Sequence, residues 1–93
     1  MDYTTGTLVR ALAGREQNEL FFVTGQSDGY VLLVNGKGRK LANPKRKNPR
    51  HLCPVSVEET NHPVIRKLKE GTPVTDRELR KALAACKEGI TLG

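Results

Sequence analysis

Residues 35–52 are the part of the chain whose residue types most clearly indicate a function. They include seven basic residues and no acidic one. Residues 1–34 carry a net charge of −2 and residues 53–93 a net charge of +1, so this stretch accounts for the +6 of the 93-residue chain. A local field of one sign is what a polyanion-binding surface requires. The seven cations are Lys37, Arg39, Lys40, Lys45, Arg46, Lys47 and Arg50.

The basic stretch could also be a solvent-exposed surface without a ligand, because runs of charged residues often have no binding function. Seven like charges without an acid among them, however, disfavour the compact state through mutual repulsion. The pattern therefore indicates nucleic-acid binding, with phosphate contacts supplying most of the affinity. An anionic membrane is the weaker alternative partner. The segment from Gly36 to Arg39 lacks the residue spacing of a phosphate-binding loop and no helix is predicted directly behind it.

Few other residues suit catalysis or metal binding. Cys53 and Cys86 form no Cys-x-x-Cys pair, so we expect two reduced, buried thiols. Together with His51 and His62 they match no zinc spacing, and we expect no metal. Paired carboxylates, a Ser-His-Asp set and a Cys-His pair in a recognisable context are all missing from the sequence. We therefore expect neither enzyme activity nor a cofactor.

Length and hydropathy limit the class of protein. A chain of 93 residues suits one small domain with a modest core. No apolar run approaches the roughly 18–20 residues of a membrane span. The first residues have neither the basic nor the apolar region of a signal peptide. We expect a cytoplasmic protein that is monomeric when free and has no membrane partner.

The first half of the chain must position the basic stretch, and its pattern is that of short strands. Asn35-Gly36 is a strong signal for a type I′ hairpin turn. Pro44 and Pro49 cannot donate ladder hydrogen bonds, so the strand after that turn should be short, irregular or at an edge. Glycine and polar residues predict loops over 14–18 and 25–29. The predicted strands cover residues 6–12, 19–24, 30–34, a return from 39 to about 42, and 51–53.

The tail changes to helical patterning. Residues 62–70 predict a short helix that Thr60 or Asn61 can cap and Gly71 ends. Thr75 and Glu78 have the spacing of a capping box at the start of a second helix, which Gly89 closes. The expected apolar stripes are Val64, Ile65 and Leu68 in the first helix, and Leu79, Ala82, Leu83 and Cys86 in the second.

Together these elements predict a mainly β protein with a helical appendage. Short strands within about 55 residues suggest a small β-barrel over residues 1–58. The two short helices, in residues 59–93, are expected to pack on the barrel and cover its open end. Phe21 and Phe22 are adjacent in a strand and must face opposite sides, so one is a core residue and the other a candidate for exposure. Tyr30 is expected in the core or packed at the barrel edge.

Runs of residues spread over most of the chain match a known pattern. The first runs are Gly6-x-x-Val9, Ala13-Gly14-Arg15 and Leu20-Phe-Phe-Val23, which resemble the KOW motif. The match continues through Tyr30-Val-Leu, Asn35-Gly36, Arg39-Lys40-Leu41, Pro44-Lys45-x-Lys47 and His51-Leu52, and in the tail through Thr60-Asn61-His62 and Thr75-Asp76-x-Glu78-Leu79-Arg80-Lys81-Ala82-Leu83. The chain thus resembles the bacterial KOW-domain RNA-binding proteins of clostridial type, which are similar to KOW-bearing large-subunit ribosomal proteins of archaea and eukaryotes.

The resemblance implies an SH3-like barrel that binds RNA without catalysis. It also implies that the loop between the first two strands contacts the RNA through Gly14, Arg15 and Asn18. Asn18 stands where the motif usually has glycine, and asparagine enters the left-handed region at modest cost. Glu16 and Glu19 make this loop less basic than is usual for the motif.

These observations predict a ribosome-associated RNA-binding protein with a role in translation. Few exposed aromatic rings are expected, which favours recognition of RNA backbone and shape over reading of single-stranded bases. His51, beside Arg50, is a candidate for phosphate contact or for a structural role at the barrel edge. The alternative is an adaptor that docks on RNA polymerase or a ribosomal protein through the barrel or the helices. An exposed apolar groove between barrel and helices would favour the adaptor.

Overall fold

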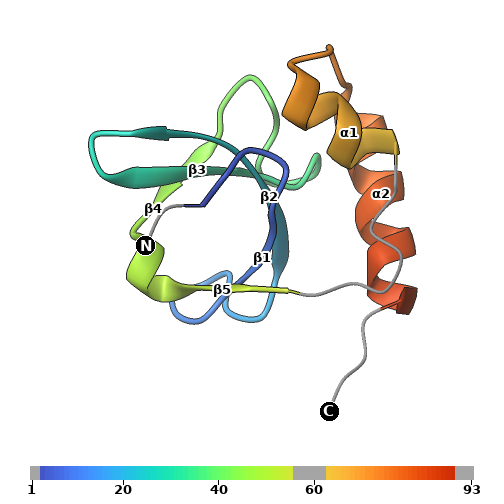
Figure 1. Cartoon of the computed structure of the whole chain (residues 1–93). Helices are drawn as coiled ribbons and strands as arrows, with labels where there is room; N and C mark the ends of the chain where they lie inside the picture. Colours follow the sequence, from blue (N-terminus) through green and yellow to red (C-terminus); the bar gives the residue numbers. More distant parts are fainter. Residues whose placement is uncertain (1–2, 56–62, 90–93) are drawn as a thin grey trace.

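The computed structural model describes residues 3–55 and 63–89. Five antiparallel strands form one sheet in the order β4-β3-β2-β1-β5. Figure 1 shows the strands curling around a common interior, with α1 and α2 side by side along one side of the sheet. The elements are β1 (Leu8–Ala11), β2 (Leu20–Ser27), β3 (Tyr30–Val34), β4 (Lys45–Lys47), the 3-10 helix η1 (Pro49–His51), β5 (Leu52–Pro54), α1 (Pro63–Glu70) and α2 (Asp76–Gly89).

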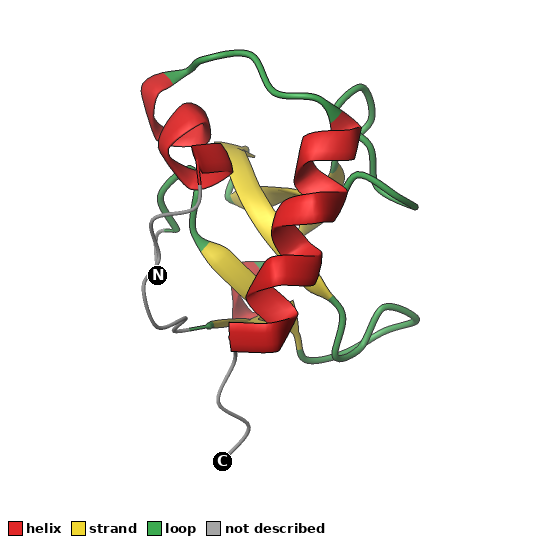
Figure 2. Ribbon diagram, turned by 90° about the vertical axis from the view of Figure 1, so that its right-hand side faces the viewer, coloured by secondary structure: helices red, strands yellow, loops and turns green. Residues whose placement is uncertain are grey.

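The sheet is apolar on both faces, and each face has its own core. Phe21 and Phe22 point to opposite sides, as alternation in a strand requires, and both are 0% exposed. Phe21 packs in a cluster with residues of β1, β3 and β5. Phe22 packs with buried residues of α1 and α2. Neither ring is exposed, because the helices cover the second face; Figure 2 shows α2 crossing in front of the strands.

Both predicted helices are confirmed, together with their apolar stripes. Val64, Ile65 and Leu68 of α1 are buried. The four predicted apolar residues of α2 are buried as well. At the start of α2 the backbone N–H of Glu78 donates to the Thr75 hydroxyl at 3.1 Å. The Glu78 carboxylate binds the Thr75 hydroxyl and Lys67. The capping box is therefore linked by an ion pair to α1.

The type I′ turn lies at Asp28-Gly29 and not at Asn35-Gly36. Asp28 and Gly29 have φ values of 51° and 82° and connect the paired residues Ser27 and Tyr30. Strand β2 thus extends to Ser27, through a bulge between Val23 and Gly25, where a turn was predicted from residue 25.

The loop after β3 is built by the side chain of Asn35. Its Oδ1 accepts hydrogen bonds from the backbone N–H groups of Lys37 (3.0 Å) and Arg39 (2.9 Å). These contacts divert the N–H groups that a returning strand would need, so the predicted strand from 39 to about 42 is wrong. Strand β4 begins at Lys45 instead and is short and at an edge, as its flanking prolines predicted.

The mainly β fold with two C-terminal helices is confirmed. Strands β4 and β5 are the two edges of the sheet, and no pairing joins them within the described strands. The predicted boundary at residue 58, the alternative caps Thr60 and Asn61, and His62, the first residue of the predicted helix, lie outside the described residues. Neither helix in the described ranges is long and apolar enough to cross a membrane.

Candidate nucleic-acid interface

The loop between β1 and β2, residues 12–19, is shaped by two left-handed residues. Gly14 has a φ of 88° and Asn18 a φ of 71°. The asparagine therefore adopts the left-handed conformation that was expected at this position. Its backbone N–H donates to Ala11 O at 2.8 Å and closes the loop. Gly14, Arg15 and Asn18 are all exposed, so the loop presents a guanidinium to solvent.

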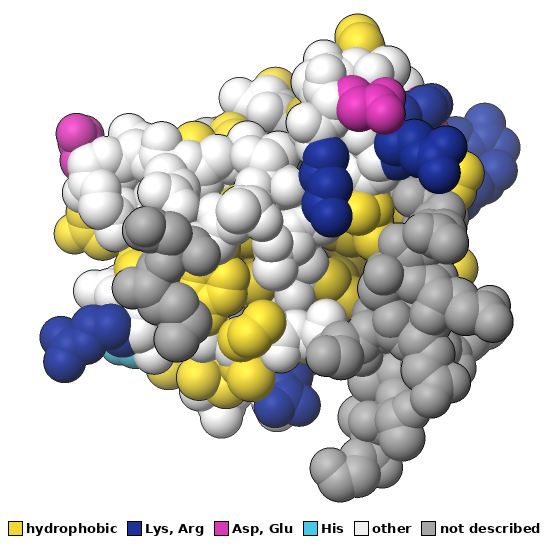
Figure 3. All heavy atoms as spheres, in the orientation of Figure 1, with side chains coloured by type: hydrophobic (Ala, Val, Ile, Leu, Met, Phe, Trp, Pro, Cys, Tyr) yellow, Lys and Arg dark blue, Asp and Glu magenta, His cyan; other side chains and the backbone are white. Residues whose placement is uncertain are grey.

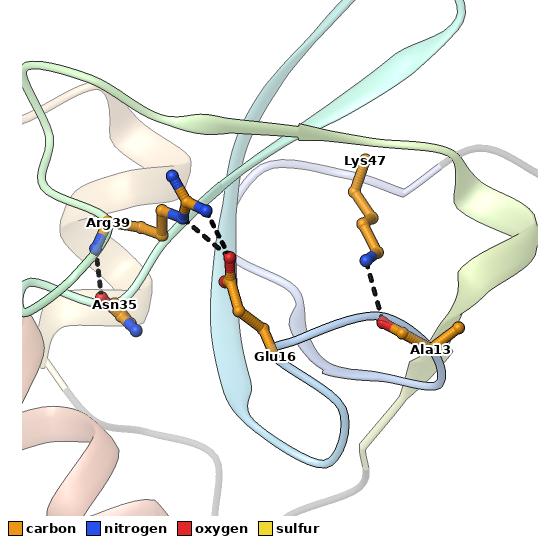
Figure 4. Close-up of polar contacts among 5 residues, drawn as sticks. All are labelled: Ala13, Glu16, Asn35, Arg39 and Lys47. Carbon is orange, nitrogen blue, oxygen red and sulfur yellow. Dashed lines mark hydrogen bonds and ion pairs between the residues drawn. The ribbon is translucent and has the colours of Figure 1, made fainter.

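Two basic side chains hold this loop, one from the segment after β3 and one from β4. Arg39 Nε donates to Glu16 Oε1 at 2.9 Å, and its Nη2 donates to the same oxygen. Lys47 Nζ donates to Ala13 O at 3.0 Å. Figure 4 shows both side chains reaching across to the loop. The hydrogen bond with Glu16 raises the pKa of Arg39, so this guanidinium is a fixed positive charge.

The 3-10 helix η1 places two more candidates at the base of the loop. The Asn48 side chain caps η1 by accepting from Arg50 N at 3.0 Å. The carbonyl of His51 accepts from Leu12 N at 2.9 Å. Arg50 and His51 have exposed side chains. The backbone of His51 is thus structural, while its imidazole stays free to contact a ligand.

Strand β4 divides the basic stretch between two faces. Lys45 pairs with Leu33 and Lys47 with Val31, whereas Arg46 pairs with Leu32. Residues that are opposite in an antiparallel pair share a face, so the two lysines share one face and Arg46 lies on the other. Its guanidinium carbon is 4.9 Å from the centre of the Tyr30 ring.

The loop of residues 35–43 lies against α2. Arg80 Nη1 donates to Gly36 O at 2.6 Å, and Asp76 Oδ1 accepts from Leu41 N at 2.8 Å. Lys37 and Lys40 are exposed on this loop. A pocket of about 280 Å³ opens between this loop, the start of β2 and α2. Its lining residues are Glu19, Leu20, Asn35, Lys37, Arg80, Leu83 and Ala84.

That pocket is at the position where the adaptor alternative predicted an apolar groove. Three of its seven lining residues carry charges of both signs. The large exposed hydrophobic residues in the described ranges, Leu12 and Tyr30, lie elsewhere. The lining of the pocket is therefore mixed, because charged side chains interrupt the apolar surface formed by Leu20, Leu83 and Ala84.

The predicted site residues thus fall into three groups. The first surrounds the β1–β2 loop, the second lies beside α2, and Arg46 occupies the opposite face of β4. On the face drawn in Figure 3, basic side chains gather over α1 and otherwise stand apart from one another. We name the first group the loop surface; it consists of Gly14, Arg15, Asn18, Arg39, Lys45, Lys47, Arg50 and His51.

Tyr30 is the residue whose exposure the sequence did not predict. It is 42% exposed, against an expectation of a core or packed edge position. The local signal was present, since Tyr30 directly follows the glycine of a two-residue turn, at the tip of a hairpin. The helices cover Val34 on the same face, but Tyr30 lies four residue pairs further along the β2–β3 ladder.

The chain matches no protein-family model and no curated protein sequence. In the part of the chain that the structure describes, no three His, Cys, Asp or Glu side chains gather as a metal site. His62, one of the four residues considered for zinc, lies outside that part. Cys53 is half-buried and Cys86 is buried, and both are free thiols.

Proposed function

We propose that the protein is a KOW-type, SH3-like barrel that binds structured RNA through the loop surface. It acts in the cytoplasm in association with the ribosome, in translation, and is monomeric when free. The observation that carries this proposal is the pair of contacts Arg39–Glu16 and Lys47–Ala13. They fix the KOW-like loop beside β4 and η1, so that cations distant in sequence form one surface.

The barrel is supported by the shortness of the connection between the sheet edges. In a flat five-stranded sheet the edge strands would lie about 19 Å apart, at four spacings of about 4.8 Å. Residues 48–51 connect β4 to β5 and include η1, whose rise is only about 2.0 Å per residue. The sheet must therefore curl so that its edges approach, as the strands of a small barrel do.

The charge of the loop surface supports phosphate binding in particular. Arg15 and Arg50 are exposed, and neither is needed to hold the loop. Exposed guanidinium groups bind phosphate oxygens in a bidentate manner. Arg39 and Lys47 have a positioning role as well as a charge, because each donates to the loop.

The test compares two double variants with the same change in charge. Arg15→Glu with Arg50→Glu removes the free cations of the loop surface. Arg77→Glu with Lys81→Glu makes the same change on exposed positions of α2. We expect the loop variant to bind an RNA hairpin at least about tenfold more weakly than wild type, while the α2 variant changes affinity much less. Equal losses would contradict the loop surface, and a larger loss in the α2 variant would place the RNA on the helices.

A further inference from the structure

Tyr30 is fixed in an exposed position at the tip of the β2–β3 hairpin. The type I′ turn of Asp28 and Gly29 sets its place, and it pairs with Ser27. Its exposed fraction is 42%, whereas Tyr3, Phe21 and Phe22 are buried. Aromatic rings have large apolar surfaces whose burial is favourable, so a ring left open at the tip of a hairpin is available for a ligand.

Arg46 lies over this ring. It pairs with Leu32, which makes it a diagonal neighbour of Tyr30 on the same face. The guanidinium carbon is 4.9 Å from the ring centre, within the range of a cation–π contact. Its ion pair with Asp28 is 3.9 Å long, between side chains that are 55% and 85% exposed, so it is weak. The tyrosine, rather than the aspartate, orients the guanidinium.

Strand β2 contributes a glycine, and so no side chain, next to the partner of Arg46 in β3. Gly25 of β2 pairs with Leu32 of β3. A Cβ at Gly25 would meet the Leu32 side chain at an ordinary contact distance of 3.7 Å, so steric need does not explain the glycine. Gly25 therefore presents no side chain beside Leu32.

We propose that Tyr30 and Arg46 form a stacking site for one unpaired base of the bound RNA. Bases stack on exposed aromatic rings and on guanidinium planes. A base within a duplex already has neighbours on both faces, so the site selects a bulged or looped nucleotide. Because β4 is an edge strand, an RNA backbone passing that edge would meet Lys45 and Lys47 on one face while its base lies on the other. This inference rests on the proposed RNA binding and names the RNA class.

The test uses Tyr30→Trp in the full chain, which has no other tryptophan. Two RNA hairpins are compared, each closed by a non-nucleotide linker so that neither has unpaired loop bases. They are identical except for a single bulged nucleotide. Stacking should quench the tryptophan with the bulged hairpin only. The wild type should bind the bulged hairpin about 5- to 150-fold more tightly, the range given by about 1–3 kcal/mol per stacked base.

Further variants distinguish the contribution of the Tyr30 ring to RNA binding from a general effect of the substitution on the fold. Tyr30→Phe keeps the ring and should keep the preference, while Tyr30→Ala should remove it. Leu12→Ala changes the other large hydrophobic residue that is exposed in the described ranges and should leave the preference intact. Equal binding of both hairpins without quenching would overturn the stacking site but leave RNA binding standing. Binding of neither hairpin would overturn RNA binding and the stacking site together.

Discussion

Glu16 and Arg39 are 23 positions apart in sequence and are joined by two hydrogen bonds to a single carboxylate oxygen. Their side chains are 19% and 34% exposed. The pair ties the β1–β2 loop to the segment after β3. It also places a negative charge within the loop surface, where a phosphate would otherwise approach Arg39.

Glu16→Gln should therefore strengthen RNA binding. Glutamine keeps the size and an acceptor oxygen but removes the charge that competes with phosphate for Arg39. We expect affinity at low salt to rise about two- to fivefold, with a free energy of unfolding lower by no more than about 1 kcal/mol. Glu70→Gln, an exposed position at the end of α1, makes the same change in charge and should have little effect. Weaker binding by Glu16→Gln would show that the ion pair serves RNA binding only by holding the loop.

Gly36→Ala should destabilise the fold strongly. A Cβ at Gly36 would lie 2.3 Å from Asp76 O and 3.0 Å from the Leu79 Cβ, and the residue has a φ of +76°. We expect a loss of at least about 2 kcal/mol in the free energy of unfolding, measured by urea or thermal unfolding. Gly38→Ala is the matched control, because a Cβ there meets nothing within 4 Å. Similar stabilities of the two variants would show that the loop does not dock on α2.

That contact explains why the two Gly-containing turns were hard to distinguish from sequence. Asp28-Gly29 and Asn35-Gly36 have the same local turn chemistry. Only the first forms the type I′ turn, because α2 packs on Gly36 and Arg80 binds its carbonyl. Spacing along the chain carries no sign of this contact between positions 36 and 80. In contrast, the stripe from Leu79 to Cys86 is a local pattern, and it predicted α2 correctly.

The candidate site, like the fold, could be predicted from the sequence only where local rules decide the structure. The left-handed Asn18 and the shared face of Lys45 and Lys47 follow from local rules on φ and on strand alternation. The contact between Glu16 and Arg39 depends on how the β1–β2 loop meets the loop after β3 in the folded sheet. The exposure of Tyr30 depends on where the helices stop covering the face.

The pair Lys67–Glu78 should make stability depend on pH in the acid range. The hydrogen bond from Lys67 lowers the pKa of Glu78 from 4.5. A lowered pKa in the folded state gives a contribution that is present above the unfolded pKa near 4.5 and is lost as the pH falls through the folded value. Between about pH 6 and 3, the melting temperature of wild type should fall more than that of Glu78→Gln. Parallel plots of melting temperature against pH for wild type and Glu78→Gln would contradict a role for this pair. The control variant Glu70→Gln should show the same pH dependence as wild type.

Removing residues 60–93 should destabilise the sheet, because Phe22 and Val34 would lose the helices that cover them. Burying Leu68, Leu79 and Leu83 contributes about 1.5–3 kcal/mol for each side chain. A fragment of residues 1–59 should therefore melt at a clearly lower temperature than the full chain. It should keep measurable RNA affinity, since the loop surface remains. An undiminished melting temperature would contradict the packing of the helices on the sheet.

The salt dependence of RNA binding tests the central claim most directly. The measurement is the dissociation constant of the full chain with a structured RNA hairpin between about 50 and 200 mM salt. If the loop surface neutralises about four to six phosphates, the association constant should fall with a log–log slope of roughly −3 to −5. A flat dependence, or no binding at the lowest salt, would contradict RNA binding through phosphate contacts.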